Sequence, residues 1–168
     1  MQRLSLADRE CPLSRTLDAV GEWWTLLLLH DCFDGFTRFD QFEANLGISS
    51  GMLTKRLKTL VDNGILERRQ YSERPPRFEY VLTDTGRSLR PVIVALAAWG
   101  NAQLPRRERS MILVDARTGR EVEPVVVDRR TGKPLDDPDA YVFAAGPAAS
   151  EAFRTRYDAL AAKRKAAR

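Results

Sequence analysis

Glycines divide the first 64 residues of this 168-residue chain into short, helix-like stretches. Four of the five glycines in this stretch mark the divisions, namely Gly21, Gly35, Gly47 and Gly64. Because glycine commonly follows the last residue of a helix, each of them predicts a helix end. With Thr37 and Ser49 as N-caps of the third and fourth helices, the pattern predicts helices near 12–20, 22–34, 38–46 and 50–63. This part of the chain is therefore expected to fold as short helices around the second one, which is apolar on most sides.

The fourth predicted helix has two unlike faces. One face is a stripe at helical spacing, formed by Leu53, Leu57, Leu60 and Val61. The opposite face carries Gly51, Lys55 and Lys58, and the first three turns contain no acidic residue. A helix of this kind packs its apolar stripe into a core and presents a basic face outward.

A β-hairpin is predicted directly after this helix. Asn63-Gly64 favours a turn, and the stretches 66–71 and 78–82 read as two strands. The connection, residues 72–77, contains two consecutive prolines, which cannot donate to a strand ladder. We therefore expect a stiff projecting loop that carries Arg74 and Arg77, followed by one more helix over 83–103.

Charge is unevenly distributed along the chain. The total of +4 combines −3 in residues 1–37, +3 in residues 38–90 and +4 in residues 150–168. Charged residues make up 30% of the sequence and hydrophobic residues 43%, which is typical of a soluble globular protein. Positive charge gathers on the predicted hairpin and basic helix and on the tail, an arrangement that favours binding to a polyanion.

The sequence offers few residues for metal binding or catalysis. His30 is the only histidine, and Cys11 and Cys32 are the only cysteines. We therefore expect no structural metal, no cofactor and no enzymatic activity of the Ser-His-Asp type. The chain also lacks a signal-peptide pattern and any apolar run of the roughly 20 residues that span a bilayer, so no membrane association and a cytosolic location are expected.

A short helix, a turn, a longer basic-faced helix and a hairpin with an arginine-bearing tip describe a winged helix-turn-helix. Residues 11–100 resemble the HxlR-type transcriptional regulators of bacteria, a winged-helix group close to the MarR type. The resemblance rests on Cys11-Pro12, Thr16-Leu17, Gly21, Trp24–Leu29, Gly35, Arg38-Phe39, Gly47–Ser49, Leu53–Lys58, Gly64–Leu66, Pro75–Arg77, Glu79-Tyr80, Leu82-Thr83, Gly86 and Trp99-Gly100. Trp23 departs from the family pattern, in which a basic residue is common at this position.

The sequence predicts an α+β, mainly α, fold in three parts, of which the resemblance covers most of the first. Residues 1–106 would form the winged helix-turn-helix and dimerisation domain, residues 107–145 a small β-hairpin extension and residues 146–168 a basic C-terminal helix. The extension repeats a D-x-x-T-G turn at Asp115–Gly119 and Asp128–Gly132. The residue spacing of this repeat is similar to that of the C-x-x-C-G knuckle of zinc ribbons, but Asp and Thr stand where the cysteines would be. We therefore expect a metal-free remnant of a zinc ribbon, made of two short β-hairpins. The terminal helix either packs with a solvated basic end or adds a contact to the DNA backbone.

The expected partner is double-stranded DNA, because a helix fits the major groove and its N-terminal residues reach base edges. The candidate DNA-binding residues are Arg38, Ser49, Ser50, Gly51, Thr54, Lys55, Lys58, Arg74 and Arg77. Arg56, beside the core stripe, either touches phosphate or braces the fold. Arg74 and Arg77 either contact DNA in the minor groove or along the phosphates, or belong to a solvated charged loop.

The family resemblance implies a homodimer that binds a two-fold symmetric operator. The candidate interface residues are Leu13, Leu17, Val92, Ile93, Leu96 and Trp99, although packing within one chain could also use this apolar surface.

Cys11, at the start of the first helix, is the candidate redox sensor, as in several HxlR-type regulators; the alternative is a small residue packed at the interface. Asp8 and Glu10 oppose thiolate formation. Cys32 and His30 are better explained as core or interface residues.

The leading hypothesis is a sequence-specific transcriptional regulator, expected to act as a repressor, located in the bacterial cytoplasm and on the nucleoid when bound. Modification of Cys11 by an oxidant or electrophile, or a small ligand near Trp23, Trp24 and Trp99, would release it. The alternative is a winged-helix protein-interaction module that does not bind specific DNA, since fold alone does not fix function.

Overall fold

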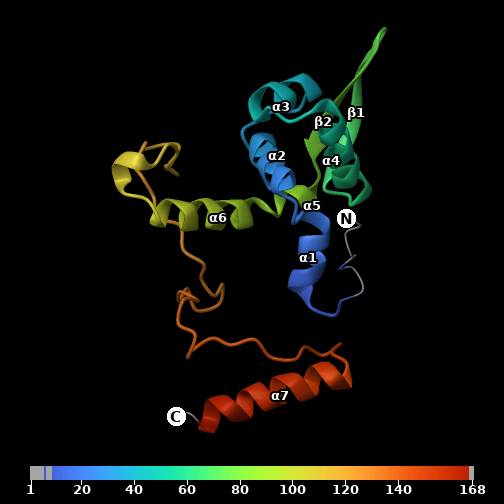
Figure 1. Cartoon of the computed structure of the whole chain (residues 1–168). Helices are drawn as coiled ribbons and strands as arrows, with labels where there is room; N and C mark the ends of the chain where they lie inside the picture. The colour runs from blue at the N-terminus through green and yellow to red at the C-terminus, as the bar shows by residue number, and fades with distance from the viewer. Residues whose placement is uncertain (1–5, 7–8, 167–168) are drawn as a thin grey trace.

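The structure is a computed structural model that describes residue 6 and residues 9–166. Its elements are α1 (Pro12–Val20), α2 (Trp23–Phe33), α3 (Phe39–Leu46), α4 (Ser50–Asp62), β1 (Leu66–Glu73), β2 (Pro76–Leu82), α5 (Asp84–Arg87), α6 (Arg90–Ala102), the 3-10 turn η1 (Arg106–Glu108) and α7 (Glu151–Ala166). Figure 1 shows α1 to α5 and the hairpin gathered together, while α6 extends away from them and α7 lies apart. The fold is mainly helical with one two-stranded antiparallel sheet, as the sequence predicts.

The four N-terminal helices confirm the glycine pattern. Gly47 follows α3 with φ of 61°, a left-handed conformation that glycine adopts without steric cost, and the chain turns there into α4. One cap prediction is wrong. Arg38, not Thr37, is the N-cap of α3, because the Gln41 side-chain oxygen accepts hydrogen bonds from the N–H groups of both Thr37 and Arg38, at 3.1 and 3.0 Å.

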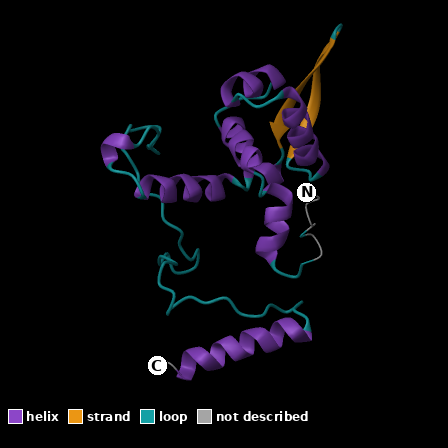
Figure 2. Cartoon of the chain, in the orientation of Figure 1, coloured by secondary structure: helices purple, strands orange, loops and turns teal. Residues whose placement is uncertain are grey.

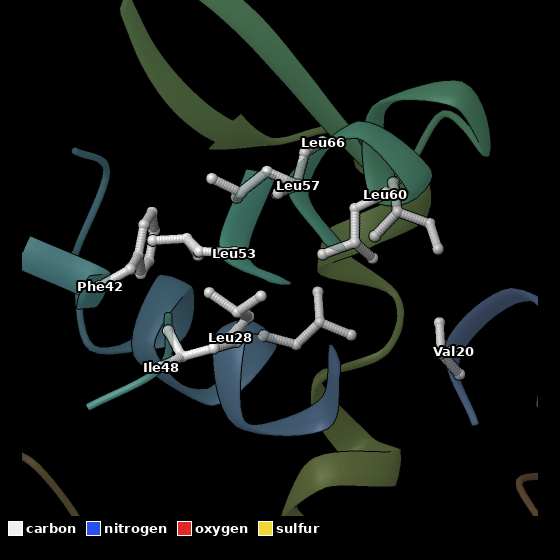
Figure 3. Packing of buried hydrophobic residues seen from close by; sticks show 10 residues of the cluster. Val20, Leu28, Phe42, Ile48, Leu53, Leu57, Leu60 and Leu66 are labelled. Atoms are coloured by element: carbon white, nitrogen blue, oxygen red, sulfur yellow. The ribbon is translucent and has the colours of Figure 1, made fainter. Parts of the chain in front are cut away.

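The core lies where α2, α3, α4 and the start of β1 meet. Phe42, Leu28, Leu53, Leu57 and Leu60 have no exposed surface, and Figure 3 shows them facing one another from different helices. Full burial of each leucine side chain stabilises the fold by about 1.5–3 kcal/mol. This core fixes the orientation of α4, whose opposite face remains at the surface.

The hairpin is longer than predicted. Its pairing runs from Leu66 opposite Leu82 to Glu73 opposite Pro76, with a bulge between Gln70 and Ser72. The predicted loop over 72–77 is therefore reduced to the two residues between the strands, and Arg77 lies on β2. Pro76 is tolerated because it is the first residue of its strand, where the ladder can end without its missing N–H.

The single helix predicted over 83–103 is two helices. Thr83 caps α5, since its Oγ1 accepts a hydrogen bond from the N–H of Gly86 at 3.1 Å. The chain then restarts as α6 with Pro91 in its first turn, where a missing N–H is tolerated. The break lets α6 leave the helical cluster at a different angle, as Figure 1 shows.

The C-terminal extension contains the two predicted tight turns but very little sheet. Asp115 Oδ1 accepts from the N–H groups of Arg117 and Thr118 at 2.8 and 3.0 Å, and Asp128 forms the equivalent turn with Arg130 and Thr131. Each turn closes a single isolated bridge, Val114 to Glu121 and Val127 to Pro134. The expected hairpins are thus one bridge long, and Figure 2 shows most of the extension as loop.

The extension has no buried core among its described residues. Between positions 87 and 166 no residue is classed as buried. The extension returns to the N-terminal region at the start of α7, where the N–H and Oγ of Ser150 donate to the carboxylate of Glu10. The terminal helix expected within residues 146–168 is present as α7 and begins at Glu151, where the Oγ of the preceding Ser150 accepts a hydrogen bond from the N–H of Phe153 at 3.2 Å.

Candidate nucleic-acid interface

The start of α4 presents small and polar side chains to solvent. Ser49 is its N-cap, and its Oγ accepts a hydrogen bond from the N–H of Met52 at 3.4 Å. Gly51, Thr54 and Lys55 are exposed, and a Cβ added at Gly51 would meet no atom within 4 Å. Helix-terminal N–H groups next to small side chains allow a close approach to an anion such as phosphate.

Ser50 is less available than the sequence indicates. Its hydroxyl donates a short hydrogen bond to the carboxylate of Glu43 in α3. This bond joins the two helices across the turn between them. The Ser50 hydroxyl must therefore release Glu43 before it can donate a hydrogen bond to a base or a phosphate.

The three basic side chains of α4 differ in their exposure and in their ion pairs. Lys55 is exposed, and no carboxylate of the described residues lies within ion-pair distance of it. Lys58 is paired with Asp62 at 2.6 Å on an exposed surface. Arg56 is only 12% exposed and is paired with Glu22 at 3.0 Å. Arg56 thus braces α4 against the start of α2, which decides between the two roles considered for it, while Lys55 is presented to solvent.

Arg38 lies where α3 meets the hairpin. Its guanidinium carbon is 4.8 Å from the centre of the Tyr71 ring on β1. The N–H of Tyr80 on β2 donates to the carbonyl of Thr37 at 2.7 Å, so the backbone beside Arg38 is also tied to the hairpin. Tyr71 was missed by the sequence reasoning, because no pattern within a strand indicates which helix its aromatic ring will face.

The hairpin tip projects beyond the helices, as Figure 1 shows. Arg74 between the strands and Arg77 on β2 are exposed, and neither has a carboxylate partner within the part of the chain that the structure describes. Two other hairpin arginines are engaged: Arg68 stacks 3.3 Å from the centre of the Phe78 ring, and Arg69 pairs with Glu67 at 2.9 Å. The tip arginines therefore extend the basic surface that begins on α4.

Two helices expose apolar side chains. Leu13 and Leu17 on α1 and Val92, Leu96 and Trp99 on α6 are each between 42% and 69% exposed. Ile93 differs from them, because it is half-buried and packs against the core of its own chain. Trp23, the departure from the family pattern, is 85% exposed at the first residue of α2.

The two cysteines have opposite environments. Cys11 occupies the N-cap position of α1, and the nearby N–H groups of Ser14 and Leu13 lower the pKa of its thiol. A smaller contribution in the same direction comes from Arg156 of α7. Burial raises the pKa of Cys32 to about 12. Thiolate formation is therefore easier at Cys11 than in an unperturbed thiol, and harder at Cys32.

The acidic residues expected to oppose a Cys11 thiolate are only partly described. The carboxylate of Glu10 faces Ser150, which lowers the pKa of that carboxyl. Asp8 lies outside the described residues. The opposing charge at Glu10 is thus directed toward the start of α7.

A helix-turn-helix with a basic second helix and a projecting arginine-bearing hairpin defines a DNA-binding transcriptional regulator of the winged-helix class. The sequence profile of the HxlR-like helix-turn-helix family matches residues 19–108, and the chain belongs to this family. No helix among the described residues is long and apolar enough to cross a membrane.

Known proteins of this kind are similar over most of the chain. The HTH-type transcriptional regulator Rv3095 of Mycobacterium tuberculosis H37Rv, itself uncharacterized, is 41% identical over 124 residues, which are 73% of this chain and 78% of that protein. The solved structure of PA1374, a candidate transcription factor of Pseudomonas aeruginosa, is 42% identical with a TM-score of 0.63 and covers 87% of this chain and 99% of its own. The redox regulator HypR in its oxidized form is 36% identical with a TM-score of 0.53, over 56% of this chain and 99% of its own. These relatives are regulators rather than enzymes.

Proposed function

We propose that this regulator is a sequence-specific repressor that binds a two-fold symmetric operator as a homodimer. The observation that carries the proposal is the exposed N-terminal half of α4, where Gly51, Thr54 and Lys55 surround the helix-terminal N–H groups. In this arrangement α4 enters the major groove, and its first turns reach base edges.

The proposed DNA contacts are of two kinds: contacts to the edges of the bases and contacts to the phosphate backbone. Ser49, Ser50, Gly51 and Thr54 face the bases, while Lys55 contacts either a base edge or a phosphate. The phosphate contacts come from Arg38 and from Lys58, which must first leave Asp62. Arg74 and Arg77 at the hairpin tip follow the adjacent minor groove.

The homodimer is supported by the exposed apolar surface of α1 and α6. Isolated exposed apolar side chains are common, but Leu13 and Leu17 give α1 an exposed apolar face, and Leu96 and Trp99 give one to α6. A two-fold interface that uses these faces brings two copies of α4 to one DNA site. Ile93 serves the core of its own chain and is left out of this interface.

Release from DNA is proposed to follow modification of Cys11. The lowered pKa of its thiol favours reaction with an oxidant or an electrophile. The likeness to the redox regulator HypR supports this role without assigning it to a residue of this chain. Because Cys11 caps α1, a modified side chain there would act directly on the proposed interface.

The proposed organisation keeps the three parts inferred from the sequence. Residues 1–106 bind DNA and dimerise, residues 107–145 form the extension, and residues 146–168 contain the basic helix α7. The proposed location is the bacterial cytoplasm, on the nucleoid when bound.

The experiment is DNA binding of the full chain to fragments of its own promoter over a range of salt concentrations. Replacing both Lys55 and Arg74 by Ala is expected to weaken binding at least tenfold and to flatten the salt dependence by about one unit of slope for each phosphate that is no longer neutralised. The matched control is Arg107→Ala, which removes an 85% exposed arginine of η1, outside the α4 and hairpin surface. Equal effects of the double substitution and the control would refute the assignment. Binding that is insensitive to salt would favour the protein-interaction alternative.

A further inference from the structure

A cavity of about 500 Å³ lies between the helical domain and the extension. The last turn of α2, with His30 and Phe33, and one face of α6 form its inner wall. The outer wall comes from residues 109–113 and 121–125, which follow the end of the region matched by the family profile. We propose that this cavity binds a small organic molecule with a mainly apolar body and one oxygen acceptor that Arg90 holds.

The lining favours an apolar body. Ile93, Val94, Ala97 and Ala98 on α6 face Ile112, Leu113, Val122 and Val125 across the cavity. The volume lies within the range of about 300–1,000 Å³ that is usual for sites of small ligands. Burying the apolar body of a ligand against these side chains supplies the binding energy, and polar groups fix its orientation.

Most polar groups around the cavity already have partners. His30 Nδ1 lies 3.5 Å from Asp34, and Nε2 lies 3.2 Å from the Met111 sulfur. Asn101 donates to the carbonyl of Met111 at 2.9 Å. Glu121 is paired with Arg106 at 2.9 Å and with Arg109 at 3.7 Å.

Arg90 is the lining cation without an ion pair among the described residues. Its guanidinium carbon lies 5.6 Å from the centre of the Phe33 ring, and its N–H groups remain available to a ligand. Asp34, Glu121 and Glu123 also line the cavity, so the site has no excess of positive charge. This balance favours one acceptor oxygen, from a carbonyl, a hydroxyl or a single carboxylate, over a polyanion.

The cavity does not coincide with the ligand site near the tryptophans that the sequence suggested. None of the three tryptophans lines it: Trp23 is exposed, Trp24 packs against the core, and Trp99 borders the adjoining groove between α6 and residues 124–127. The lining positions of α6 recur at three- and four-residue spacing from Arg90 to Asn101, whereas Val92 and Leu96 point the opposite way. One helix thus carries the ligand wall on one side and the proposed dimer surface on the other.

This geometry gives a bound molecule a route to DNA binding, and this step rests on the proposed function. A ligand that moves α6 changes the angle between two copies of α4, and a ligand that moves the end of α2 acts on α3 through residues 34–38. Binding itself requires neither DNA nor the dimer.

The binding test uses His30, since a single histidine gives one set of imidazole resonances in the NMR spectrum. Two probes are titrated into the full chain: naphthalene-2-carboxylate, with an anionic acceptor, and 2-acetylnaphthalene, with a neutral one. A saturable shift of the His30 resonances with at least one probe is expected, and the probe that binds more tightly tells which acceptor Arg90 prefers. No saturable shift with either probe at about 1 mM, a concentration that detects binding of only about −4 kcal/mol, would overturn the proposal.

Matched variants locate the binding. Ala97→Trp on the inner wall and Val122→Trp on the outer wall fill the cavity and are expected to weaken binding at least tenfold. Val142→Trp is the control, because Val142 is an exposed valine of the extension that does not line the cavity. Arg90→Gln is expected to weaken binding about tenfold, and Arg107→Gln to leave it unchanged.

The outcomes separate the two proposals. If Ala97→Trp fails to fold, as judged by circular dichroism, Val122→Trp on the exposed wall still decides. Equal losses with Val122→Trp and Val142→Trp, or no loss with Arg90→Gln, would overturn the site. Because no readout here involves DNA, failure of this test leaves the DNA-binding proposal standing, and failure of DNA binding leaves the cavity assignment standing.

Discussion

At the scale of single residues, two glycines of this chain serve different purposes. A Cβ at Gly86 would lie 2.2 Å from the backbone carbonyl oxygen of Ile65, so the close contact between α5 and the residue that precedes β1 requires the absence of a side chain. A Cβ at Gly51 would meet open space on the outer face of α4. The first glycine is needed for folding, and the second is available for an approach to DNA.

Substituting each glycine by alanine tests this difference. Gly86→Ala is expected to destabilise the fold by more than about 2 kcal/mol, because the clash is with backbone that cannot rotate away. Gly51→Ala is expected to stabilise α4 by about 0.5–1 kcal/mol, because alanine loses less backbone entropy in a helix. Thermal or denaturant unfolding measures both. Equal stability of the two variants would show that the packing at Gly86 is looser than described.

Cys11 gives a prediction with a definite direction in pH. Its pKa is lowered, so its thiolate, which is the reactive form, is populated at lower pH than in an unperturbed cysteine. Alkylation of Cys11 by iodoacetamide, followed by mass spectrometry of the peptides, is expected to reach half its maximal rate at a lower pH than alkylation of a cysteine in an unstructured peptide.

Two variants control the alkylation experiment. Cys11→Ser leaves only Cys32, whose pKa of about 12 predicts negligible alkylation in the same range. Arg156→Gln removes a favourable charge and is expected to move the Cys11 midpoint to higher pH. A Cys11 midpoint at or above the ordinary thiol value would contradict the assigned environment and weaken the proposed switch.

At the scale of elements, a helix end, cap or buried face was predicted correctly wherever a single local signal in the sequence determined it. Gly47 ends α3, Ser49 caps α4, and the leucine stripe of α4 lies in the core as its spacing predicts. The predictions failed where two local signals competed. Gln41 binds the N–H groups at the start of α3 and moves its cap by one residue, and Pro91 divides the helix that apolar periodicity predicted as continuous.

The candidate site was predicted only in part for a similar reason. Periodicity identifies the exposed face of α4, and the prolines identify a hairpin tip, so Lys55 and Arg74 are recognisable from the sequence. Contacts between distant segments are not encoded in this way. His30 and Met111 are 81 residues apart, and the cavity that they border has no signature in either segment.

The apolar surface of α6 predicts the oligomeric state of the protein. Leu96→Glu places a charge on a side chain that is 48% exposed in the single chain and that a partner would bury, so it is expected to shift the protein from dimer to monomer. Met52→Glu, on an α4 side chain that is 37% exposed, is the matched control and is expected to leave the dimer intact. Light scattering coupled to size-exclusion chromatography distinguishes the two states. A dimer that persists in Leu96→Glu would place the interface elsewhere.

At the scale of the whole molecule, the chain combines a compact family domain with an extension that has little packing of its own. The absence of buried residues between positions 87 and 166 contrasts with the fully buried leucines and phenylalanine of the N-terminal half. The extension nevertheless contributes one wall of a cavity and, through Ser150 and Arg156, touches the surroundings of Cys11. The DNA-binding surface of α4, the Cys11 thiol and the cavity thus lie on one set of packed helices, with the thiol at the start of α1 and the cavity between α2, α6 and the extension.

The central claim is that the exposed face of α4 reads a specific DNA sequence as part of a two-fold symmetric dimer. Selection of bound fragments from a random DNA pool by the purified full chain, with sequencing of the enriched fragments, tests it most directly. The predicted result is an inverted repeat whose half-sites are separated by about one helical turn, roughly 10 base pairs or a multiple of it, and which the Lys55→Ala, Arg74→Ala double variant does not enrich. Enrichment of no common sequence, or of the same sequence by the double variant, would contradict the claim.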